Sequence, residues 1–338
     1  MLRTSEWVSL GHPDKIADYI SSYLLDRHLE RDPKTRFAVE VMVKDQIVTL
    51  GGEIASEADF SDDEITQFVR NAVNEIGYTR MYQEKWGREN TVCGDQMEVY
   101  PLLGRQSPDI GQGVERDAWG DQGIFFGMAL DRPSSGNMPR DHYLARKLGL
   151  ALFRSRLGGL DIKTLVATRD GNASHVTIAI PLMDGDVNED AVRRRAEETT
   201  GCRDLTLNGT GRYVTHSSVA DCGVTGRKLA VDFYGGNCRI GGGSTWGKDA
   251  TKADVTLNIH ARKLALDFMR KYRKHTVVCA ISCSIGSPEI EVAYTDGAGR
   301  ELHREKATAR PADLMARYGL DQPVFAKLCR EGLFHGLR

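Results

Sequence analysis

Several features that mark other classes of protein are scarce or missing in this chain of 338 residues. No apolar run reaches the ~18 residues that a membrane span requires. The N-terminal sequence MLRTSEWVSLGHPDK lacks the apolar core of a signal peptide. The seven cysteines are odd in number and form no C-x-x-C pair, which argues against a disulfide framework and a zinc site. We therefore expect a protein of a reducing, cytoplasmic compartment with no membrane partner.

An excess of charge of one sign is also missing. The chain has 45 Lys and Arg against 47 Asp and Glu, a net charge of −2, so a large nucleic-acid-binding face is not expected. Neither G-x-x-x-x-G-K-[ST] nor a G-x-G-x-x-G after a strand is present, so the two most familiar nucleotide-binding folds are not indicated. The hydrophobic fraction of 41% is typical of globular proteins, and the length allows two or three domains.

Glycine and charge are concentrated in one stretch, from Asp221 to Asp254, where eight of 34 residues are glycine. The charged residues in this stretch that we consider are Arg227, Lys228, Lys248, Lys252, Asp221, Asp249 and Asp254. Glycine lets the backbone approach a ligand, cations attract a polyphosphate, and aspartate can hold a divalent metal. The stretch thus predicts a phosphate-binding surface. A solvated linker is the alternative, against which we set the strand-like run LAVDFY (229–234) and the scarcity of serine and proline.

One pattern, a helix followed by two strands and a second helix, occurs three times along the chain. The first copy comprises a helix over 14–30, strands within 36–54 that turn at Asp45-Gln46, and a helix that begins with the capping box Ser61–Glu64 and ends at Gly77. The second comprises a helix over 141–157, strands over 164–170 and 174–182, and a helix over 189–199. The third comprises a helix over 253–272, strands over 276–285 and 289–296, and a helix over 312–319.

These copies predict an α+β fold of three similar domains related by an approximate threefold axis. The expected domains are residues 1–104, 119–219 and 220–338. The copies share a pattern and not their letters, so an ordinary alternation of helices and strands is the alternative. Residues 105–118 fall in a polar, glycine-rich segment without apolar periodicity. Such a long segment is usually functional or disordered, so a mobile gate over a site and a plain connector both stay open.

Three further positions are candidates on chemical grounds. Gly11-His12-Pro13-Asp14-Lys15 stands directly before the first predicted helix and gathers an imidazole, a carboxylate and an ammonium group. Its Asp14 could equally be a simple helix cap. Glu40 interrupts a strand whose alternate residues are apolar, where a carboxylate is costly unless it is solvated, paired or bound to a cation. Glu53 follows two glycines and could face a ligand amine or only solvent.

Seven sequence blocks carry a resemblance to a known family. They are GHPDKIAD (11–18), GGEI (51–54), RQSPDIGQGV (105–114), GDQG (120–123), TGRY (210–213), DCGVTGRK (221–228) and GGGSTWGKDATKAD (241–254). Their identity and order resemble those of S-adenosylmethionine synthetases. The resemblance implies a methionine adenosyltransferase of S-adenosylmethionine biosynthesis, in which the sulfur of methionine attacks C5′ of ATP and expels triphosphate. The triphosphate is then hydrolysed to pyrophosphate and phosphate. Such chemistry needs alignment and cationic stabilisation of the leaving group, and no covalent catalyst.

The resemblance also implies the roles of individual residues. The implied catalytic residues are His12, Lys163, Arg227, Lys228, Lys248 and Lys252. The implied ATP-binding residues are His12, Asp161, Lys163, Arg212, Tyr213, Asp221, Arg227, Lys228, Ser244 and Lys248. Those implied for methionine are Glu53, Gln106, Asp121, Asp221 and Lys248. Asp14 and Asp254 resemble ligands of Mg²⁺, of which two ions are expected, and Glu40 resembles the ligand of K⁺.

The resemblance further implies self-association into a dimer or tetramer whose active sites are shared between subunits, with 105–118 as the gating loop. The chain departs from the family at Leu10, where glutamate is usual, at Ser244-Thr245-Trp246, in a shorter loop after Val114, and at its C-terminal FHGLR. These departures put methionine specificity and gating in doubt. The alternatives are therefore an adenosyltransferase that prefers a methionine analogue, and a nucleotide-binding homologue without turnover.

Overall fold

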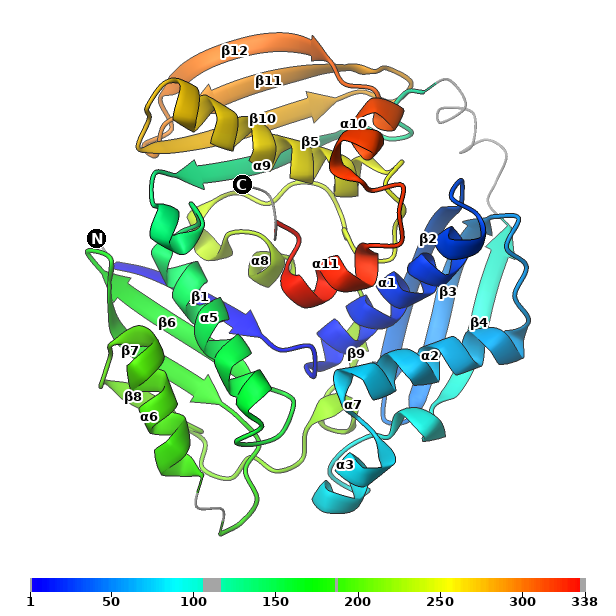
Figure 1. Cartoon of the computed structure of the whole chain (residues 1–338), viewed down its shortest axis with the longest axis vertical. Coiled ribbons are helices and arrows are strands. Elements are labelled where there is room, and N and C mark those ends of the chain that lie inside the picture. The colour runs from blue at the N-terminus through cyan, green and yellow to red at the C-terminus, as the bar shows by residue number, and fades with distance from the viewer. Residues whose placement is uncertain (1, 106–116, 186–187, 335–338) are drawn as a thin grey trace.

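The computed structural model of the chain describes residues 2–105, 117–185 and 188–334. Three four-stranded sheets enclose a group of central helices, as Figure 1 shows. The first sheet has the order β4-β3-β2-β9, the second β1-β6-β7-β8 and the third β12-β11-β10-β5. This arrangement confirms the predicted α+β class with three similar units.

The first sheet is built around a hairpin. Its strands are β2 (Arg36–Lys44), β3 (Ile47–Ala55), β4 (Glu98–Arg105) and β9 (Gly223–Val224). The hairpin turns at Asp45, whose φ of 50° is left-handed, and β4 runs parallel to β3. On β2 the apolar residues Phe37, Val39, Val41 and Val43 are buried and Glu40 is exposed, as the period of two predicts.

The other two sheets are also built around an antiparallel hairpin. The second contains β1 (Leu2–Val8), β6 (Lys163–Arg169), β7 (Asn172–Ala179) and β8 (Leu205–Leu207). The third contains β5 (Gly123–Leu130), β10 (Thr276–Cys283), β11 (Glu289–Thr295) and β12 (Glu301–Thr308). The sequence pattern predicted the hairpins β6–β7 and β10–β11 and missed the strands at the sheet edges.

Each sheet takes a strand from a distant part of the chain. The N-terminal β1 pairs with β6 of the second sheet, β5 pairs with β10 of the third, and β9 pairs with β2 of the first. The sheets therefore cross the predicted boundaries at 104, 119 and 220 by one strand each. The predicted domain boundaries themselves stay a prediction.

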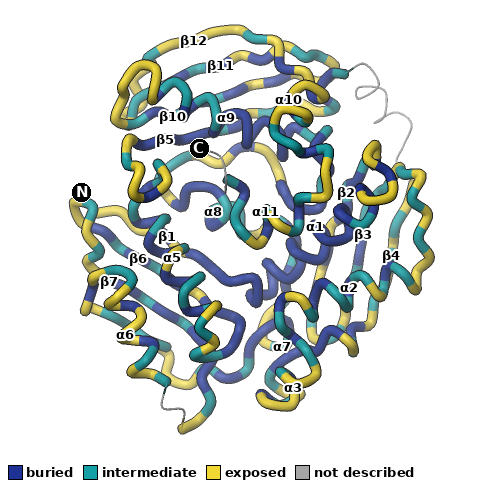
Figure 2. Tube along the Cα trace, viewed as in Figure 1, coloured by how far each residue is buried: buried dark blue, intermediate teal, exposed yellow. Residues whose placement is uncertain are grey.

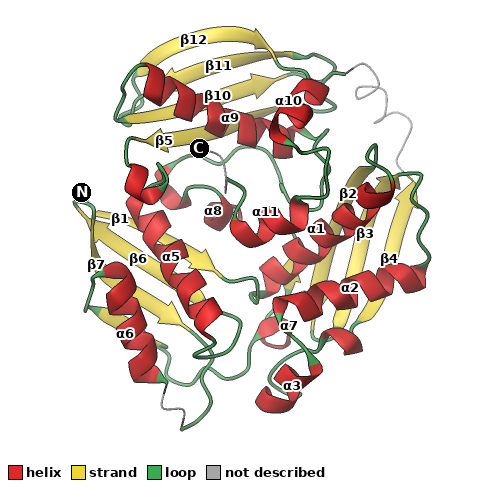
Figure 3. Cartoon of the chain, in the orientation of Figure 1, coloured by secondary structure: helices red, strands yellow, loops and turns green. Residues whose placement is uncertain are grey.

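The helices alternate with the strands along the chain (Figure 3). They are α1 (Pro13–Arg31), α2 (Asp62–Ile76), α3 (Arg80–Trp86), α5 (Arg140–Ser155), α6 (Glu189–Thr200), α7 (Ser217–Ala220), α8 (Leu229–Asp232), α9 (Ala253–Lys271), α10 (Pro311–Tyr318) and α11 (Phe325–Glu331). Short 3-10 turns lie at Gly94–Gln96, Pro133–Ser135 and Gly235–Asn237. The Ser61–Glu64 capping box and the Gly77 terminus of α2 are confirmed.

The predicted strand over 229–234 is wrong. Residues 229–232 form the short helix α8, and Val231 and Phe233 are buried in the core. A short apolar run cannot be distinguished from a buried helical turn by periodicity alone. The interpretation as a strand failed for that reason, although the rejection of a solvated linker here agrees with the burial.

The central helices are buried on nearly all sides, whereas the outer edges of the sheets are exposed (Figure 2). Helix α1 packs against β2, α5 packs against β1 and β6, and α9 packs against β5 and β10. Within the described ranges, no helix has the length and apolar character needed to cross a membrane. The N-terminal ends of α1 and α9 carry Asp14 and Asp254, the two candidate metal ligands.

Candidate active site

A first group of candidate residues gathers at the N-terminus of α1. We call His12, Asp14, Lys163, Arg227 and Lys228 the Asp14 set. Gly11 makes this approach possible, because a Cβ there would lie 2.3 Å from the backbone oxygen of Leu160. The close contact brings the start of α1 beside the segment that leads into Lys163.

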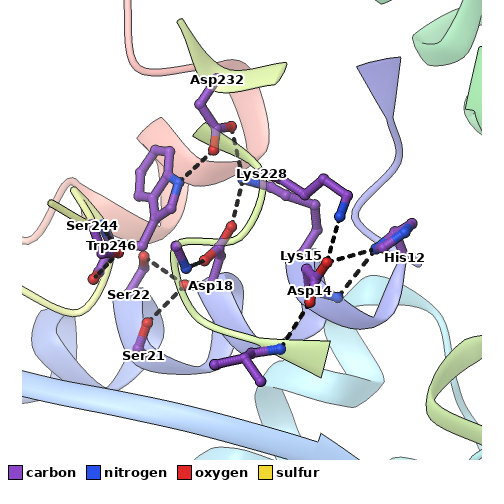
Figure 4. Close-up of polar contacts among 12 residues, drawn as sticks. His12, Asp14, Lys15, Asp18, Ser21, Ser22, Lys228, Asp232, Ser244 and Trp246 are labelled. Atoms are coloured by element: carbon purple, nitrogen blue, oxygen red, sulfur yellow. Dashed lines mark hydrogen bonds and ion pairs between the residues drawn. The ribbon is translucent and has the colours of Figure 1, made fainter. Parts of the chain in front are cut away.

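Asp14 is the centre of this set. Its carboxylate is fully buried and accepts a hydrogen bond from Val224 N–H at 2.9 Å. Lys228 Nζ donates to one carboxylate oxygen (Figure 4). Arg227 Nε lies 3.0 Å from the other. Burial alone would raise the pKa of Asp14, but the bonds from Lys228 and Val224 outweigh it and lower that pKa. Asp14 is therefore an anion held by two cations.

His12 caps α1 next to this carboxylate. Its Nδ1 accepts a hydrogen bond from Asp14 N–H at 3.1 Å, and its side chain is buried. Burial and the charges of Lys228 and Lys163 lower the pKa of His12 to about 3. The imidazole is thus neutral at neutral pH and surrounded by cations.

A third part of this region combines Asp161 and Tyr213. Tyr213 Oη donates to the backbone oxygen of Asp161 at 3.1 Å, and Ser217 N–H donates to the Asp161 carboxylate at 3.3 Å. Burial raises the pKa of Asp161 to about 6, Lys163 lowers it and Asp221 raises it. Because Lys163 and Asp221 both change the pKa of Asp161, their charges lie near the Asp161 carboxyl group. Asp161 and Tyr213 therefore lie beside Lys163 of the Asp14 set.

A second group gathers where the stretch 247–249 runs along β2. Val39 N–H donates to Gly247 O at 2.8 Å, and Ala38 forms an isolated bridge with Lys248. Gly247 has a φ of +75°, and a Cβ at this position would lie 2.2 Å from Val39 O. Only glycine fits such a contact, so its presence fixes Lys248 against the sheet.

We call Glu40, Lys248 and Asp254 the Asp254 set. Lys248 Nζ lies 2.7 Å from Asp254, whose other oxygen accepts Gly243 N–H at 2.6 Å. Burial raises the pKa of Glu40, Lys248 lowers it and Asp254 raises it. Glu40 therefore lies within electrostatic reach of both partners, on the exposed face of β2.

Glu53 lies on the same face of the first sheet as Glu40. It is the direct cross-strand partner of Ala38, and Glu40 is the partner of Gly51. Directly opposed residues of an antiparallel pair point to the same side. Because Ala38 also bridges to Lys248, the structure brings Glu53 to the neighbourhood of the Asp254 set.

Three predicted residues form contacts with residues outside the two sets. Arg212 pairs with Asp184 at 3.0 Å on an exposed surface, and Lys252 faces Asp249 at 3.5 Å. Asp121 is exposed, and its carboxylate accepts Gln122 N–H. Gln106 lies outside the described residues, as does most of the predicted gating loop 105–118.

Ser244 connects the two sets. Its hydroxyl donates to Trp246 O at 3.0 Å, and a Cβ on Gly226 would lie 2.6 Å from its side chain. Gly226 directly precedes Arg227 and Lys228 of the Asp14 set. The segments that carry the two sets therefore touch at Gly226 and Ser244.

A metal at this site would be held by single carboxylates of the chain. Among the residues that the structure describes, no group of three or more His, Cys, Asp or Glu side chains could hold a metal ion. Mg²⁺ commonly keeps several waters and binds one or two carboxylates together with substrate phosphates. Single carboxylates such as Asp14 and Asp254 fit that mode, in which the nucleotide supplies the remaining ligands.

Comparison with known proteins decides the family. The N-terminal domain model of S-adenosylmethionine synthetase matches residues 1–108, and the C-terminal domain model matches residues 215–336. The S-adenosylmethionine synthase of Desulforudis audaxviator (strain MP104C) is 34% identical, covering 98% of this chain and 93% of that protein. The chain belongs to the S-adenosylmethionine synthetase family.

A solved structure agrees with this assignment. An unusual S-adenosylmethionine synthetase from Campylobacter jejuni superposes with a TM-score of 0.88 at 28% identity, covering 98% of this chain and 94% of that one. As a member of the S-adenosylmethionine synthetase family, the chain is a methionine adenosyltransferase. The match over nearly the whole length confirms the family resemblance on which the site residues were predicted.

Sequence reasoning missed the residues beneath the site. Asp18 is buried and accepts Gly226 N–H, and the Asp232 side chain, which is 6% exposed, accepts the indole N–H of the buried Trp246. The signal for Asp18 was its place four residues after Asp14, one helical turn along the buried helix α1. Leu10 and Trp246, two departures from the family pattern, are both buried, at 9% and 1% exposure.

Proposed function

We propose that this site joins ATP and L-methionine by attack of the methionine sulfur at C5′, with release of triphosphate that is then hydrolysed to pyrophosphate and phosphate. The observation that carries the proposal is the buried Asp14, held by Arg227 and Lys228 beside a neutral His12. Cations next to one carboxylate match what a triphosphate with bound magnesium requires.

In this proposal His12 donates a hydrogen bond to the leaving group. A neutral imidazole whose Nδ1 accepts from the backbone carries its proton on Nε2. That N–H would donate to the oxygen that leaves C5′ as negative charge develops on it. His12 positions and stabilises, because attack of sulfur at carbon requires no proton transfer from the nucleophile.

The cations stabilise the departing triphosphate. The proposed contacts are Lys163, Arg227, Lys228, Lys248 and Lys252, of which Lys252 faces Asp249 at 3.5 Å. One cation ~4 Å from a phosphate charge contributes roughly 4 kcal/mol before desolvation at an effective dielectric near 20. Several such contacts would account for a large part of the catalysis.

Tyr213 and the acidic residues bind the organic parts of the substrates. We propose that Tyr213 stacks on adenine, with Asp161, Arg212, Asp221 and Ser244 around the adenosine. The proposed contacts to methionine are Glu53, Gln106, Asp121, Asp221 and Lys248. The placement of Glu53 on the face that carries Lys248 supports the methionine role.

Magnesium and potassium complete the proposed site. Asp14 and Asp254 would each contribute an oxygen to Mg²⁺, and Glu40 would contribute one to K⁺. When bound, these ions neutralise phosphate charge during cleavage at C5′. This chain supports the proposal because each of the three carboxylates already interacts with a positive charge. Asp14 pairs with Lys228, Asp254 pairs with Lys248, and Lys248 lowers the pKa of Glu40.

We propose that two copies of the chain pair through the open face of the first sheet, with a tetramer as a further possibility. Met42, Tyr100 and Leu102 are 46%, 51% and 68% exposed. Register places Tyr100 opposite Thr49 and Leu102 opposite Gly51, on the side that carries Glu40. An exposed apolar face around functional carboxylates favours an interface that contributes to a shared site.

The proposal is tested by incubating the protein with ATP, methionine, Mg²⁺ and K⁺ and measuring S-adenosylmethionine, triphosphate hydrolysis and their ratio. Product well above that of a His12→Ala variant supports it, and product no greater than that of the variant refutes it. A panel of methionine analogues in the same assay tests altered specificity. Tight ATP binding with neither product would favour the non-catalytic homologue.

A further inference from the structure

Directly beneath the two sets lies a buried ion cluster that uses none of the residues assigned above. Its centre is Lys15, whose side chain is 4% exposed. Lys15 Nζ lies 3.0 Å from Asp18 and 2.8 Å from Asp232, and 4.6 Å above the ring of Trp246 (Figure 4). One cation thus faces two carboxylates and an indole in a nearly dry environment.

The second oxygen of each carboxylate points to a different segment. Asp18 accepts Gly226 N–H at 2.8 Å, and Asp232 accepts Trp246 Nε1–H at 2.8 Å. The contacts therefore form one path from Gly226 through Asp18, Lys15 and Asp232 to Trp246. Lys15 donates a hydrogen bond to Asp232, whereas its link to Asp18 is an ion pair in which Asp18 Oδ2 accepts no hydrogen bond from the described residues.

The two ends of this path are the two catalytic segments. Gly226 is followed at once by Arg227 and Lys228 of the Asp14 set, and Trp246 precedes Lys248 of the Asp254 set by two residues. Lys15 itself follows Asp14 on the first turn of α1. We propose that Lys15 is a positioning residue that fixes both triphosphate-binding segments on α1 through Asp18 and the Asp232–Trp246 pair.

This role rests on the proposed function of Arg227, Lys228 and Lys248. A buried ion pair is weak evidence for stability, because desolvation offsets most of its Coulomb energy. Its directional bonds nevertheless favour one arrangement of the attached segments over others. Here those segments are rich in glycine, whose backbone has many accessible conformations, so these bonds help to fix their geometry.

The arrangement also explains one departure from the family pattern. Trp246 is 1% exposed, and its ring edge and face are occupied by Asp232 and Lys15. The tryptophan is therefore used beneath the site, where an indole N–H can reach a carboxylate. A role in lining a methionine pocket does not follow from this placement.

The decisive variant is Trp246→Phe, which removes the N–H to Asp232 and keeps most of the ring. Trp86→Phe is the matched control, because Trp86 is buried at 5% exposure and stacks on Tyr82 instead. Binding of inorganic tripolyphosphate and of adenosine is measured by calorimetry for both. We expect the tripolyphosphate Kd of Trp246→Phe to rise about fivefold, the change that corresponds to one lost hydrogen bond. Its adenosine Kd should stay within twofold.

Asp18→Asn tests the end of the path that runs through Asp18 to Gly226. The amide places a donor toward Lys15 and should weaken the hold on Gly226, with the same selective loss of tripolyphosphate affinity. Asp26→Asn is its control, since Asp26 lies on the same helix, is buried, and accepts Phe325 N–H and Ala326 N–H far from the site. Thermal midpoints of all four variants separate lost stability from lost positioning.

The outcomes distinguish a failure of the proposed function from a failure of the positioning role of Lys15. If the unmodified protein binds no tripolyphosphate, the assignment of the cationic segments is wrong. If it binds and Trp246→Phe and Asp18→Asn match their controls in tripolyphosphate affinity, the positioning role of Lys15 is refuted. If adenosine affinity falls as much as tripolyphosphate affinity, the cluster supports the site only as general structure, which also overturns the proposal.

Discussion

His12 and Asp14 are joined by a hydrogen bond in which the Asp14 N–H donates to His12 Nδ1 over 3.1 Å. The bond uses one of the N–H groups that the first turn of a helix leaves unpaired, and it selects the tautomer protonated at Nε2. One interaction therefore caps α1 and orients the remaining N–H of a ring that burial and nearby cations keep neutral. Helix formation and the readiness of the catalytic imidazole depend on the same contact.

His12→Ala is expected to lower kcat by roughly 10²–10³-fold, the loss typical when one donor to a developing oxyanion is removed. Tripolyphosphate affinity should change by less than about threefold, since one neutral donor adds little to ground-state binding. Rates of S-adenosylmethionine formation at saturating substrates check this prediction.

The control for His12 lies on the same helix. His28 is buried, and its Nδ1 contacts Leu24 O at 2.8 Å, remote from the site. His28→Ala should lower the thermal midpoint and leave kcat of the folded protein nearly unchanged. Equal loss of kcat in the two variants would contradict a direct role for His12.

Acid should destabilise the protein through its buried histidines. Burial lowers the pKa of His142 to about 4, and the carboxylate of Asp141 only partly opposes this shift. The unfolded chain titrates its histidines near pH 6.5 and so binds more protons than the fold between pH 6.5 and 4. The stability that the neutral ring contributes is fully present above pH 6.5 and is lost as the pH falls toward 4.

The direction of this pH effect on stability can be measured with one substitution. His142→Gln removes the titrating ring, so the fall in thermal midpoint between pH 7 and pH 5 should be smaller in this variant than in the unmodified protein. His303→Gln serves as the control, because that side chain is 50% exposed. A steeper acid-induced fall in His142→Gln than in the unmodified protein would show that the sign is reversed.

Local rules predicted the units of this fold but not the way in which they are joined. The alternation on β2 and the Ser61–Glu64 box are local, and both are confirmed. The pairing of β1 with β6 joins residues more than 150 positions apart, and no periodicity within either strand encodes it. The structure places the two sets of site residues, but their predicted roles came from family resemblance.

The cluster around Lys15 shows what local reasoning misses. Lys15 and Asp18 stand within GHPDKIAD, where a sequence pattern alone would place charged residues on a solvated face. They are buried because helix α11 packs against α1 and Asp232 of α8 pairs with Lys15, contacts between segments far apart in the sequence. Buried charge signals function or specificity only after its partners are known.

Asp254 should control the affinity for magnesium. Asp254→Asn keeps the shape and removes the charge, so the Mg²⁺ concentration for half-maximal activity should rise by about 10-fold or more. Asp267→Asn is the matched control on the same helix, because Asp267 is 45% exposed and pairs only with Lys263 among its described contacts. Magnesium titrations of activity and of ATP-dependent thermal shift measure the effect. An unchanged half-saturation in Asp254→Asn would remove this residue from the metal site.

Leu102 tests whether the open face of the first sheet is an interface between copies. Leu102→Lys places a charge on a side chain that is 68% exposed and lies beside Gly51, near Glu40. If two copies meet there, the variant should sediment as a monomer and lose activity at low protein concentration, because burial of an unpaired lysine is costly. Met81→Lys is the control, since Met81 is 79% exposed on α3. Sedimentation and activity measured over the same concentration range should therefore change together in Leu102→Lys and in neither respect in Met81→Lys. A Leu102→Lys variant with unchanged size and activity would place the interface elsewhere.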